Sequence, residues 1–315
     1  MTSRSAPEAR YDLVVIGAGI TGVQIAREAA ARGRSVLLVD KGDFGSGTSS
    51  ATTKYLHGGI RYLEQLDVRV VRESLRERRI AALSAPHLVT RRPFLLPVWS
   101  WTRPGHWSMR AGGAMYDALA FDRNRDAPAA LRVGRTRWIG RSEVQRAVPW
   151  LDAIDLLGAL VVSEMLNVHP ERLLLEYLLD AVSLGADTRN YSGVSGFMTA
   201  SRDDGIVEVQ GVELTDTSGG TVHRVAARAV VNAAGPWMGE VLGRLGDRDG
   251  RRVGPTVNPS KGVHLLTTES TQPTVRGVTS AVLARSRSGR HVVVSPWQGR
   301  EMIGPTDTPV VLPPD

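Results

Sequence analysis

The start of the chain alternates between short apolar runs and a longer segment whose apolar residues have helical spacing. Residues 12–15 form an apolar run, glycines follow it, residues 20–32 have a helical pattern, and residues 36–39 form a second apolar run. A strand, a helix and a second strand in this order predict the βαβ opening of a parallel sheet.

Further helical and strand-like stretches follow. Helical patterns cover residues 67–83, ending near Pro86, and residues 170–184, where proline and glutamate begin the helix. Strands are predicted at 206–214, 223–227, 229–232, 263–267, 291–294 and 301–304. Between residues 91 and 150 the pattern is broken by Pro93, Pro97, Pro104, Pro128 and Pro149. This stretch is therefore predicted to be an inserted, irregular region.

The alternation of strands and helices predicts two domains. Residues 1–85 and 165–250 form a discontinuous nucleotide-binding domain, and residues 86–164 and 251–315 form a second domain. A chain of 315 residues with 42% hydrophobic residues can bury cores of this size. The sequence stops in a proline-rich stretch directly after a predicted strand, so we expect it to be truncated at the C-terminus.

A GxGxxG motif lies between the first strand and the first helix. Gly17 makes the tight turn, Gly19 lets the backbone approach a pyrophosphate, and Gly22 lets the helix pack closely on the strand. The helix N-terminus adds a positive dipole, and Asp40 at the end of the second strand is placed to bind ribose hydroxyls. Together these features predict a dinucleotide site.

Two further segments favour FAD over NAD as that dinucleotide. Residues 45–59, GSGTSSATTKYLHGG, are small, hydroxylated and glycine-rich, which suits a loop along a pyrophosphate and beside a flat ring. Residues 230–237, VVNAAGPW, form an apolar strand that runs into a glycine, as in a later dinucleotide-contacting strand of many flavoproteins. Each segment alone is also compatible with an ordinary loop or core strand.

At these residues the sequence resembles FAD-dependent glycerol-3-phosphate dehydrogenases, within the D-amino-acid-oxidase-like group of flavoproteins. The segments that carry the resemblance are VVIGAGITGVQIAREAAARG at 14–33, TSSATTKYLHGGIRYLE at 48–64, APHLV at 85–89, MYDAL at 115–119, VVNAAGPW at 230–237, SKGVH at 260–264 and IGPTD at 303–307. The block at 48–64 is specific to that family, and the resemblance covers essentially the whole chain as an N-terminal portion. It implies an α/β fold, with a Rossmann-like FAD-binding domain on a parallel sheet and a second, mixed α+β substrate (cap) domain.

The resemblance also implies roles for individual residues. Arg61 and Tyr62 match family residues at the substrate, and Lys261 and His264 match a lysine and a histidine on the flavin side. Thr306 and Asp307 match a family TTD sequence, in which Pro305 replaces the first threonine. The cofactor-binding residues are then Gly17, Gly19, Gly22, Asp40, Lys41, Thr48, Ser49, Ser50, Lys54, His57, Gly58, Gly59, Val194, Ala234 and Gly235.

The sequence departs from the family in two places. HPER at 169–172 differs from an acidic DxR pattern at the same helix start, which affects local structure only. The later half of the family is missing, including a GVRPL segment whose arginine holds substrate and a GGKLTTYR segment that closes the flavin site. Catalysis by the chain alone is therefore an open question.

The expected chemistry is oxidation of sn-glycerol 3-phosphate to dihydroxyacetone phosphate. Hydride passes to FAD N5, and electrons pass on to a quinone or another acceptor. His264 is the candidate base for the hydroxyl proton, because histidine titrates near neutral pH, although a hydrogen-bonded structural role is the alternative. Arg61 offers a planar fork for a phosphate and Lys261 a point charge. Oxidation of a 2-hydroxy acid or an amino acid, or a catalytically incomplete FAD-binding fragment, are the alternative functions.

Composition narrows the choice of partners. The absence of cysteine excludes disulfides and thiolate sites, and without an HExxH or GxSxG sequence no metal site or hydrolase is predicted. The net charge of +7 suits an anionic ligand, an anionic membrane surface or nucleic acid, and by itself it does not choose among them. The basic helix at 67–83 also contains acidic residues, so it is interpreted as a solvated face and no nucleic acid is predicted as a partner. No run of 18 apolar residues occurs, so no membrane-spanning helix is predicted and a cytoplasmic protein is expected. A homodimer is an open alternative for the oligomeric state.

Three tryptophans lie close together in the predicted second domain. Arg103, His106 and Arg110 lie alongside Trp99, Trp101 and Trp107, a combination that suits the headgroup layer of an anionic membrane. The hypothesis is peripheral attachment to the inner face of the membrane. The alternative is that these rings pack inside the second domain.

Overall fold

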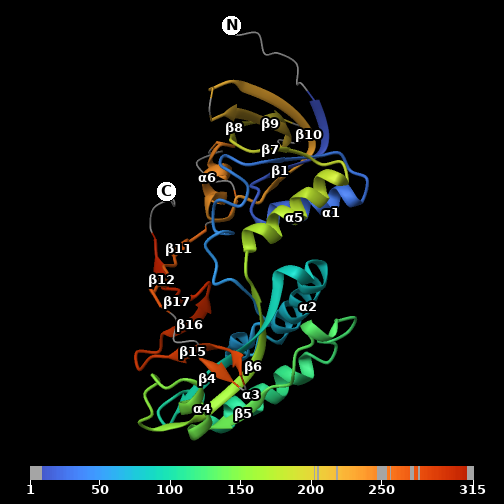
Figure 1. Ribbon diagram of the computed structural model, residues 1–315. Coiled ribbons are helices and arrows are strands. Elements are labelled where there is room, and N and C mark those ends of the chain that lie inside the picture. Colours follow the sequence, from blue (N-terminus) through green and yellow to red (C-terminus); the bar gives the residue numbers. More distant parts are fainter. Residues whose placement is uncertain are drawn as a thin grey trace. The chain divides into compact units, whose positions relative to one another are not determined.

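The computed structural model describes residues 9–201, 203, 206–217, 219–246, 254, 255, 257–269, 273–275 and 277–310. Two compact units are defined by contacts within the chain. The first, unit 1, comprises Met1–Thr52, Pro170–Ser260 and Pro309–Asp315. The second, unit 2, comprises Thr53–His169 and Lys261–Thr308. Each unit has its own sheet and core (Figure 1).

Unit 1 is built on a largely parallel sheet. Its elements are β1 (Ala9–Ile16), α1 (Ile20–Ala31), β2 (Val36–Val39), α5 (Pro170–Ser183), β7 (Asp187–Arg189), β8 (Ser192–Ser201), β9 (Val207–Asp216), β10 (Val222–Asn232), the 3-10 turn η4 (Gly235–Trp237) and α6 (Met238–Gly243). The strand order is β7-β2-β1-β10-β9-β8, in which β7, β2, β1 and β10 run parallel while β9 and β8 form an antiparallel extension. The predicted βαβ opening is present.

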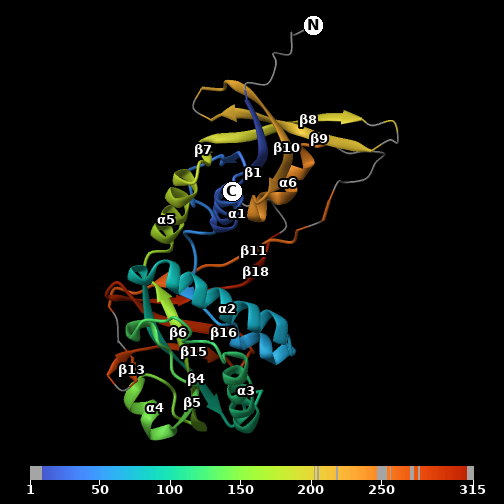
Figure 2. The same ribbon diagram turned by 90° about the vertical axis from the view of Figure 1, so that its right-hand side faces the viewer.

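Burial on both faces explains the continuous apolar runs in the centre of this sheet. Every residue of β2 is buried, and Val14 and Val15 of β1 are inaccessible to solvent. Helices α1 and α5 lie side by side against it in both views (Figures 1 and 2). The small residues Gly22 and Ala26 on the buried face of α1 allow this close approach.

Unit 2 is built on a larger mixed sheet. Before residue 169 it contains β3 (Tyr55–Leu56), η1 (Ile60–Gln65), α2 (Val68–Ser84), η2 (Pro86–Leu88), β4 (Val89–Trp99), α3 (His106–Leu119), η3 (Ala129–Leu131), β5 (Arg137–Gly140), α4 (Arg141–Ala147) and β6 (Leu156–Asn167). The later elements are β12 (Leu265–Leu266), β13 (Thr274–Val275), β14 (Val278–Thr279), β15 (Ala281–Arg285), β16 (His291–Trp297) and β17 (Arg300–Gly304). The sheet order is β12-β17-β16-β15-β4-β6-β3, and β5 also pairs with β6. Two short strands, β11 (Ser260–Lys261) and β18 (Thr308–Pro309), pair with each other.

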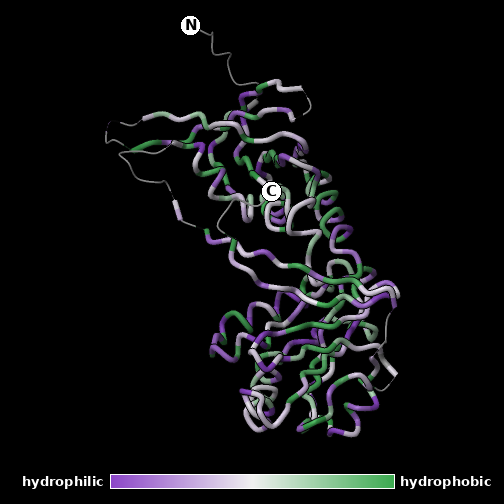
Figure 3. The backbone as a smooth tube through the Cα atoms, turned by 90° about the vertical axis from the view of Figure 1, so that its left-hand side faces the viewer, coloured by the Kyte–Doolittle hydropathy of each residue, from purple (hydrophilic) through white to green (hydrophobic). Residues whose placement is uncertain are grey.

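The strands of unit 2 carry apolar cores on both faces of the sheet. Leu75 of α2 and Tyr116 of α3 pack with Leu96 on one face, and Val144 of α4 packs with Leu95 on the other. Figure 3 shows hydrophobic stretches of the chain along these strands.

The prediction that residues 91–150 are irregular is wrong for most of that stretch. Strand β4 contains Pro93 and Pro97 and still pairs with β6 from Val89 to Trp99. Proline removes one backbone donor, but it leaves those of its neighbours, and burial of this strand on both faces outweighs that loss. Helix α3 then begins directly after Gly105. The prediction gave too much weight to the prolines and too little to the apolar residues between them.

The boundary between the units also differs from the predicted one at residue 85. Residues 53–85 belong to unit 2, because α2 buries Val71 and Leu75 against Phe94 and Leu96 of β4. The sequence pattern showed this amphipathic helix but not which core it covers.

Candidate active site

The glycine motif forms the turn between β1 and α1 in unit 1. Gly17 has φ +98°, and a Cβ on it would lie 2.6 Å from the carbonyl oxygen of Ala233. A Cβ on Gly22 would lie 1.8 Å from the carbonyl oxygen of Gly17. A Cβ on Gly19 would meet only the hydroxyl of Ser49, at 3.3 Å. Backbone packing therefore requires glycine at positions 17 and 22, whereas Gly19 lies against a side chain that can move.

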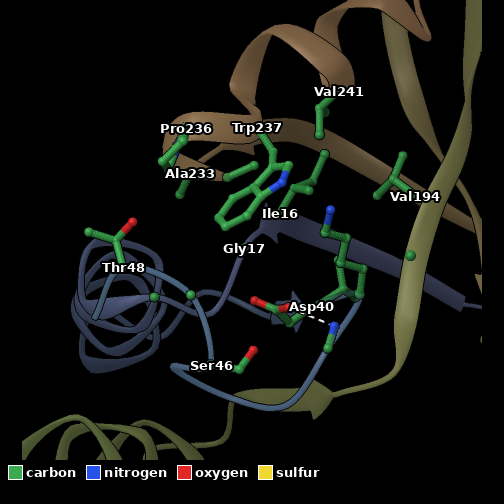
Figure 4. Close-up of a pocket in the computed structure, with 18 of the residues that line it drawn as sticks. Ile16, Gly17, Asp40, Ser46, Thr48, Val194, Ala233, Pro236, Trp237 and Val241 are labelled. Carbon is green, nitrogen blue, oxygen red and sulfur yellow. Dashed lines mark hydrogen bonds between the residues drawn. The ribbon is translucent and has the colours of Figure 1, made fainter. Parts of the chain in front are cut away.

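Asp40 is held at the end of β2 by two backbone donors. The N–H of Ala18 donates to Oδ2 at 2.6 Å, and that of Gly42 donates to Oδ1 at 2.9 Å. Figure 4 shows the Asp40 carboxylate with one dashed hydrogen bond. A carboxylate has about four acceptor sites. The fixed Asp40 side chain therefore keeps acceptor capacity for the hydroxyls of a ribose.

A cavity of about 540 Å³ opens beside this turn. Its walls come from residues 16–21, 39–49, 192–194 and 233–244. In Figure 4 the ring of Trp237 and the carboxylate of Asp40 enter the space from opposite sides. Lys41 Nζ lies 4.8 Å from the centre of the Trp237 ring and 3.9 Å from a carboxylate oxygen of Glu240. The volume is in the range of cofactor sites.

The lining of the cavity fits a dinucleotide. Helix α1 begins at the cavity and has no acidic residue in its first turn. The N–H of Ile20 in that turn donates to the hydroxyl oxygen of Ser49 at 2.9 Å. This positive helix end suits a pyrophosphate. Ile16, Val39 and Val194 supply an apolar wall for a flat ring.

Most of the predicted cofactor residues line this one cavity. They are Gly17, Gly19, Asp40, Lys41, Thr48, Ser49, Val194, Ala234 and Gly235. Gly22 lies outside the lining and packs α1 on the turn, and the hydroxyl of Ser50 donates to the carbonyl of Gly47. The predicted cofactor residues Lys54, His57, Gly58 and Gly59 belong to unit 2, so their cofactor role stays a prediction. Trp237 and Ser46 also line the cavity and were missed, although VVNAAGPW contains the tryptophan.

In unit 2 a buried polar network holds the turn at Gly58. Arg78 Nη1 donates to Glu164 Oε2 at 2.6 Å, and both side chains are almost inaccessible, at 4% and 6% exposure. The hydroxyl of Tyr116 donates to the other carboxylate oxygen at 3.1 Å, and burial, together with Glu164, raises the pKa of Tyr116. The N–H of Gly58 donates to Glu164 Oε2 at 2.9 Å, and a Cβ on Gly58 would lie 1.9 Å from the Tyr116 oxygen. The network therefore fixes the glycine turn that precedes Arg61.

Sequence reasoning missed this network. Its one visible signal was the lone acidic residue Glu164 in the apolar segment that forms β6. An acid there requires a buried partner, and Arg78 on the apolar side of a basic helix provides it.

A smaller cavity of about 190 Å³ lies next to this turn. Arg61 and Tyr62, the predicted substrate residues, line it together with His57, Glu164 and Pro305. Tyr55 lines it as well, and burial raises the pKa of its hydroxyl to about 12, while that hydroxyl lies 2.6 Å from Ser295 Oγ. The cavity thus combines a guanidinium with one imidazole and several hydroxyl groups.

The other predicted substrate residues meet through backbone pairing. The N–H of Thr306 donates to the carbonyl of Val263 at 3.0 Å, and the N–H of Val263 donates to Thr306 Oγ1 at 2.9 Å. This pairing places the SKGVH segment, with Lys261 and His264, against Thr306 and Asp307. Pro305, which precedes Thr306, links this group to the smaller cavity.

His264 has the properties of a base. Its Nε2 is buried and has no hydrogen-bond partner within the described part of the chain. Burial, and next the charge of Lys54, lower the pKa of His264 below its usual 6.5. The imidazole is therefore neutral at neutral pH, with a nitrogen that can accept a proton.

The three tryptophans do not form one surface cluster. Trp99 is 5% exposed, packs with Leu95 and donates through Nε1 to the carbonyl of Asp152 at 3.0 Å, and Trp101 stacks on it with 5.3 Å between ring centres. Trp107 is 76% exposed. The expectation of a lipid-facing cluster is therefore wrong for Trp99, because an apolar core covers it. In the described ranges no helix is both long and apolar enough to cross a membrane.

The parallel sheet, the glycine turn, the acid after β2 and the adjoining cavity define a dinucleotide-binding α/β protein. The family of FAD dependent oxidoreductases matches residues 12–315, and the chain belongs to this family. The predicted fold class is confirmed, and FAD as the cofactor is confirmed at the level of the family.

Individual relatives share a common name. The glycerol-3-phosphate dehydrogenase of a Synechocystis species is 34% identical over 304 residues, which cover 94% of this chain and 52% of the relative. The aerobic glycerol-3-phosphate dehydrogenase of Staphylococcus epidermidis is 34% identical over 96% of this chain and 50% of its own length. The resemblance stated from the motifs is thereby confirmed. This chain spans about half the length of the curated relatives it matches.

Solved structures agree with these matches. The glycerol-3-phosphate dehydrogenase from Bacillus halodurans, complexed with FAD, aligns with a TM-score of 0.69 at 30% identity, over 96% of this chain and 48% of that one. L-proline dehydrogenase from P. horikoshii aligns with a TM-score of 0.70 at 18% identity, over 98% and 73% of the two chains, which shows a common fold.

Proposed function

We propose that this chain is the FAD-binding part of an enzyme that oxidises sn-glycerol 3-phosphate to dihydroxyacetone phosphate. The observation that carries the proposal is His264, a neutral imidazole whose buried Nε2 has no hydrogen-bond partner in the described residues. It lies beside a segment paired with Thr306 and linked through Pro305 to the cavity of Arg61. The names of the relatives support the same substrate.

Substrate binding is assigned to the cationic and hydroxyl groups of unit 2. Arg61 presents a planar fork that matches two phosphate oxygens, and Lys261 adds a point charge. Tyr62 lines the same cavity as Arg61 and can donate to a substrate hydroxyl. A cavity of about 190 Å³ suits a small polyol phosphate better than a bulky substrate.

The reaction removes a hydride and a proton from the alcohol at C2. His264 accepts the hydroxyl proton through Nε2, and the carbon–oxygen bond becomes a carbonyl. When bound, FAD supplies the acceptor for the hydride, and its electrons pass on to a quinone or another acceptor. We assign FAD to the cavity of unit 1, held by Gly17, Gly19 and Asp40.

The test uses the chain reconstituted with FAD under anaerobic conditions. We expect glycerol 3-phosphate to bleach the flavin absorbance, whereas lactate and glycine leave it unchanged. Bleaching by lactate or glycine alone would assign the chain to a different substrate class. Binding of glycerol 3-phosphate without bleaching would contradict the catalytic part of the proposal.

Substitution of Arg61 tests the binding role separately. Loss of a charged, bidentate contact costs on the order of 2–5 kcal/mol, so Arg61→Ala should weaken calorimetric binding of glycerol 3-phosphate and leave glycerol binding unchanged. Arg61→Lys keeps the charge without the fork and should restore binding only in part. Equal affinity of wild type and Arg61→Ala would remove this residue from the site.

A further inference from the structure

Unit 2 contains a second, larger cavity that the proposed oxidation does not use. Its volume is about 490 Å³, within the range of sites for drug-sized ligands. Its walls come from η1, α3, β4, β15 and the turn at residues 102–104. It shares Ile60, Arg61, Leu96 and Leu283 with the smaller cavity.

A glycine in the middle of α3 leaves part of this cavity open. A Cβ on Gly112 would meet no heavy atom within 4 Å, although Gly112 lines the cavity. Glycine inside a helix costs about 0.5–1 kcal/mol relative to alanine. At the next position, a Cβ on Gly113 would already lie 3.1 Å from Leu160. Packing explains Gly113, whereas Gly112 weakens the helix with no packing reason and keeps space beside it.

One end of the cavity is cationic. Arg61, Arg103, Arg285 and His291 line it together with a single carboxylate, Glu64. Glu64 lies 3.7 Å from Arg285 and 3.9 Å from His291, and three guanidinium groups line the cavity against this one acid. Burial, and then Arg61, lower the pKa of His291 despite the opposing effect of Glu64. The potential at this end therefore favours an anion.

The remaining wall is apolar. Leu63, Met109, Met115 and Leu160 line the body of the cavity, and methionines adapt their shape to an aliphatic ligand. Leu66 also lines it and is 74% exposed. A small polar phosphate would leave this surface uncovered.

We propose that this cavity binds an amphiphilic anion, a phosphate or carboxylate head on a single aliphatic chain. Arg285 and Arg103 contact the head, and the chain lies along Met109, Met115 and Leu160 in the space beside Gly112. The site adjoins the proposed substrate cavity and shares Arg61 with it, but Gly112, Met109 and Arg285 line the larger cavity alone.

Calorimetry with dodecyl phosphate below its micelle concentration tests the proposal. We expect one bound molecule per chain, at least tenfold weaker binding of dodecanol, and no saturable binding of inorganic phosphate outside the substrate cavity. A parallel titration with dodecanoate shows whether the head is a phosphate or a carboxylate. Dodecanol that binds as tightly as dodecyl phosphate and dodecanoate, or several molecules bound per chain, would overturn the proposal.

Two variants locate the site. Gly112→Leu fills the open space and should weaken dodecyl phosphate binding at least tenfold without lowering Tm. Ala114→Leu is the matched control, since Ala114 is exposed on the same helix and does not line the cavity. Arg285→Ala should weaken binding of dodecyl phosphate but not of dodecanol, and it tests the head group even if Gly112→Leu fails to fold. Unchanged affinity in the folded Gly112→Leu and Arg285→Ala variants would refute the site.

Discussion

The two units build their cavities in different ways. Glycines and small residues of the turns at 17–19, 45–49 and 233–235 line much of the cavity in unit 1, and close backbone approach explains why glycine stands at positions 17 and 22. Unit 2 lines its cavities with long side chains, and a buried network of Arg78, Glu164 and Tyr116 holds the turn at Gly58. A cavity built on tight turns can therefore be predicted from the spacing of glycines in the sequence. A cavity built from long side chains depends on residues that are far apart in the sequence.

One ion pair from each unit gives a second comparison. In unit 1 the pair of Arg244 and Glu240 is a turn of helix apart and well exposed, with 37% and 40% of the two side chains accessible. The pair of Arg78 and Glu164 in unit 2 is desolvated. An exposed pair contributes little to stability, whereas breaking a buried one leaves an unpaired charge in the core.

The largest effect is expected from the glycine turn of unit 1. Gly22→Val should abolish folding of unit 1, because its side chain would overlap the backbone of Gly17. Gly19→Val should fold, since only the Ser49 hydroxyl is near, but should purify without flavin colour. Circular dichroism and flavin absorbance of the two variants check this. If Gly19→Val retained stoichiometric FAD, the site is misplaced.

The buried pair of unit 2 gives the next effect. Arg78→Met leaves Glu164 buried without its partner and should lower the free energy of unfolding by about 3–5 kcal/mol. Arg244→Met in unit 1 is the matched control and should change it by less than about 0.5 kcal/mol. Urea denaturation measures both. Equal losses in the two variants would contradict the contrast between the units.

Acidification should destabilise unit 2 by less than the loss of the buried Arg78–Glu164 pair does. The pKa values of His264 and His291 are lowered in the folded chain. As pH falls through the usual 6.5, these histidines therefore bind protons in the unfolded chain before they do so in the folded chain. The free energy of unfolding should therefore decrease below pH 6.5, until the pH falls beneath the lowered pKa values. Asp122, whose pKa is lowered by its hydrogen bond to Arg72, acts only at more acid pH, below its usual 3.8.

A double variant isolates the histidines. His264→Asn combined with His291→Asn should flatten the curve of unfolding free energy against pH in this window. A curve that keeps its slope would assign the pH dependence to other groups.

The smallest effect on stability is expected at Trp107. Its side chain is exposed, so Trp107→Ala should change the free energy of unfolding by less than about 0.5 kcal/mol, whereas Trp99→Ala should lower it by about 3–5 kcal/mol. Trp107 is the most exposed of the three tryptophans on which the hypothesis of peripheral membrane attachment rests, and that hypothesis can be tested on it. Cosedimentation with anionic liposomes should fall in Trp107→Ala and at high salt. Cosedimentation equal to wild type would exclude that contact.

The sequence predicted unit 1 better than unit 2 for a physical reason. The βαβ opening, the glycine turn and Asp40 are close in sequence, and their spacing follows from local geometry. In β4 the residues between Pro93 and Pro97 become a strand only because β6 and two cores cover them. Glu164 and Arg78 are 86 residues apart, and no local pattern relates them. The predicted Arg61, Lys261 and His264 came from family motifs rather than from spacing.

The pairing of β1 with β10 has a consequence for synthesis on the ribosome. Val14 pairs with Val230, so β1 waits for this neighbour until β10, far later in the sequence, has been made. The whole first segment of unit 2 is translated in between, and its sheet waits in turn for β15 and β16. Such non-local pairing folds slowly and exposes apolar strand edges meanwhile. A nascent chain that ends before β10 carries an unpaired β1 edge, which makes premature termination an aggregation hazard.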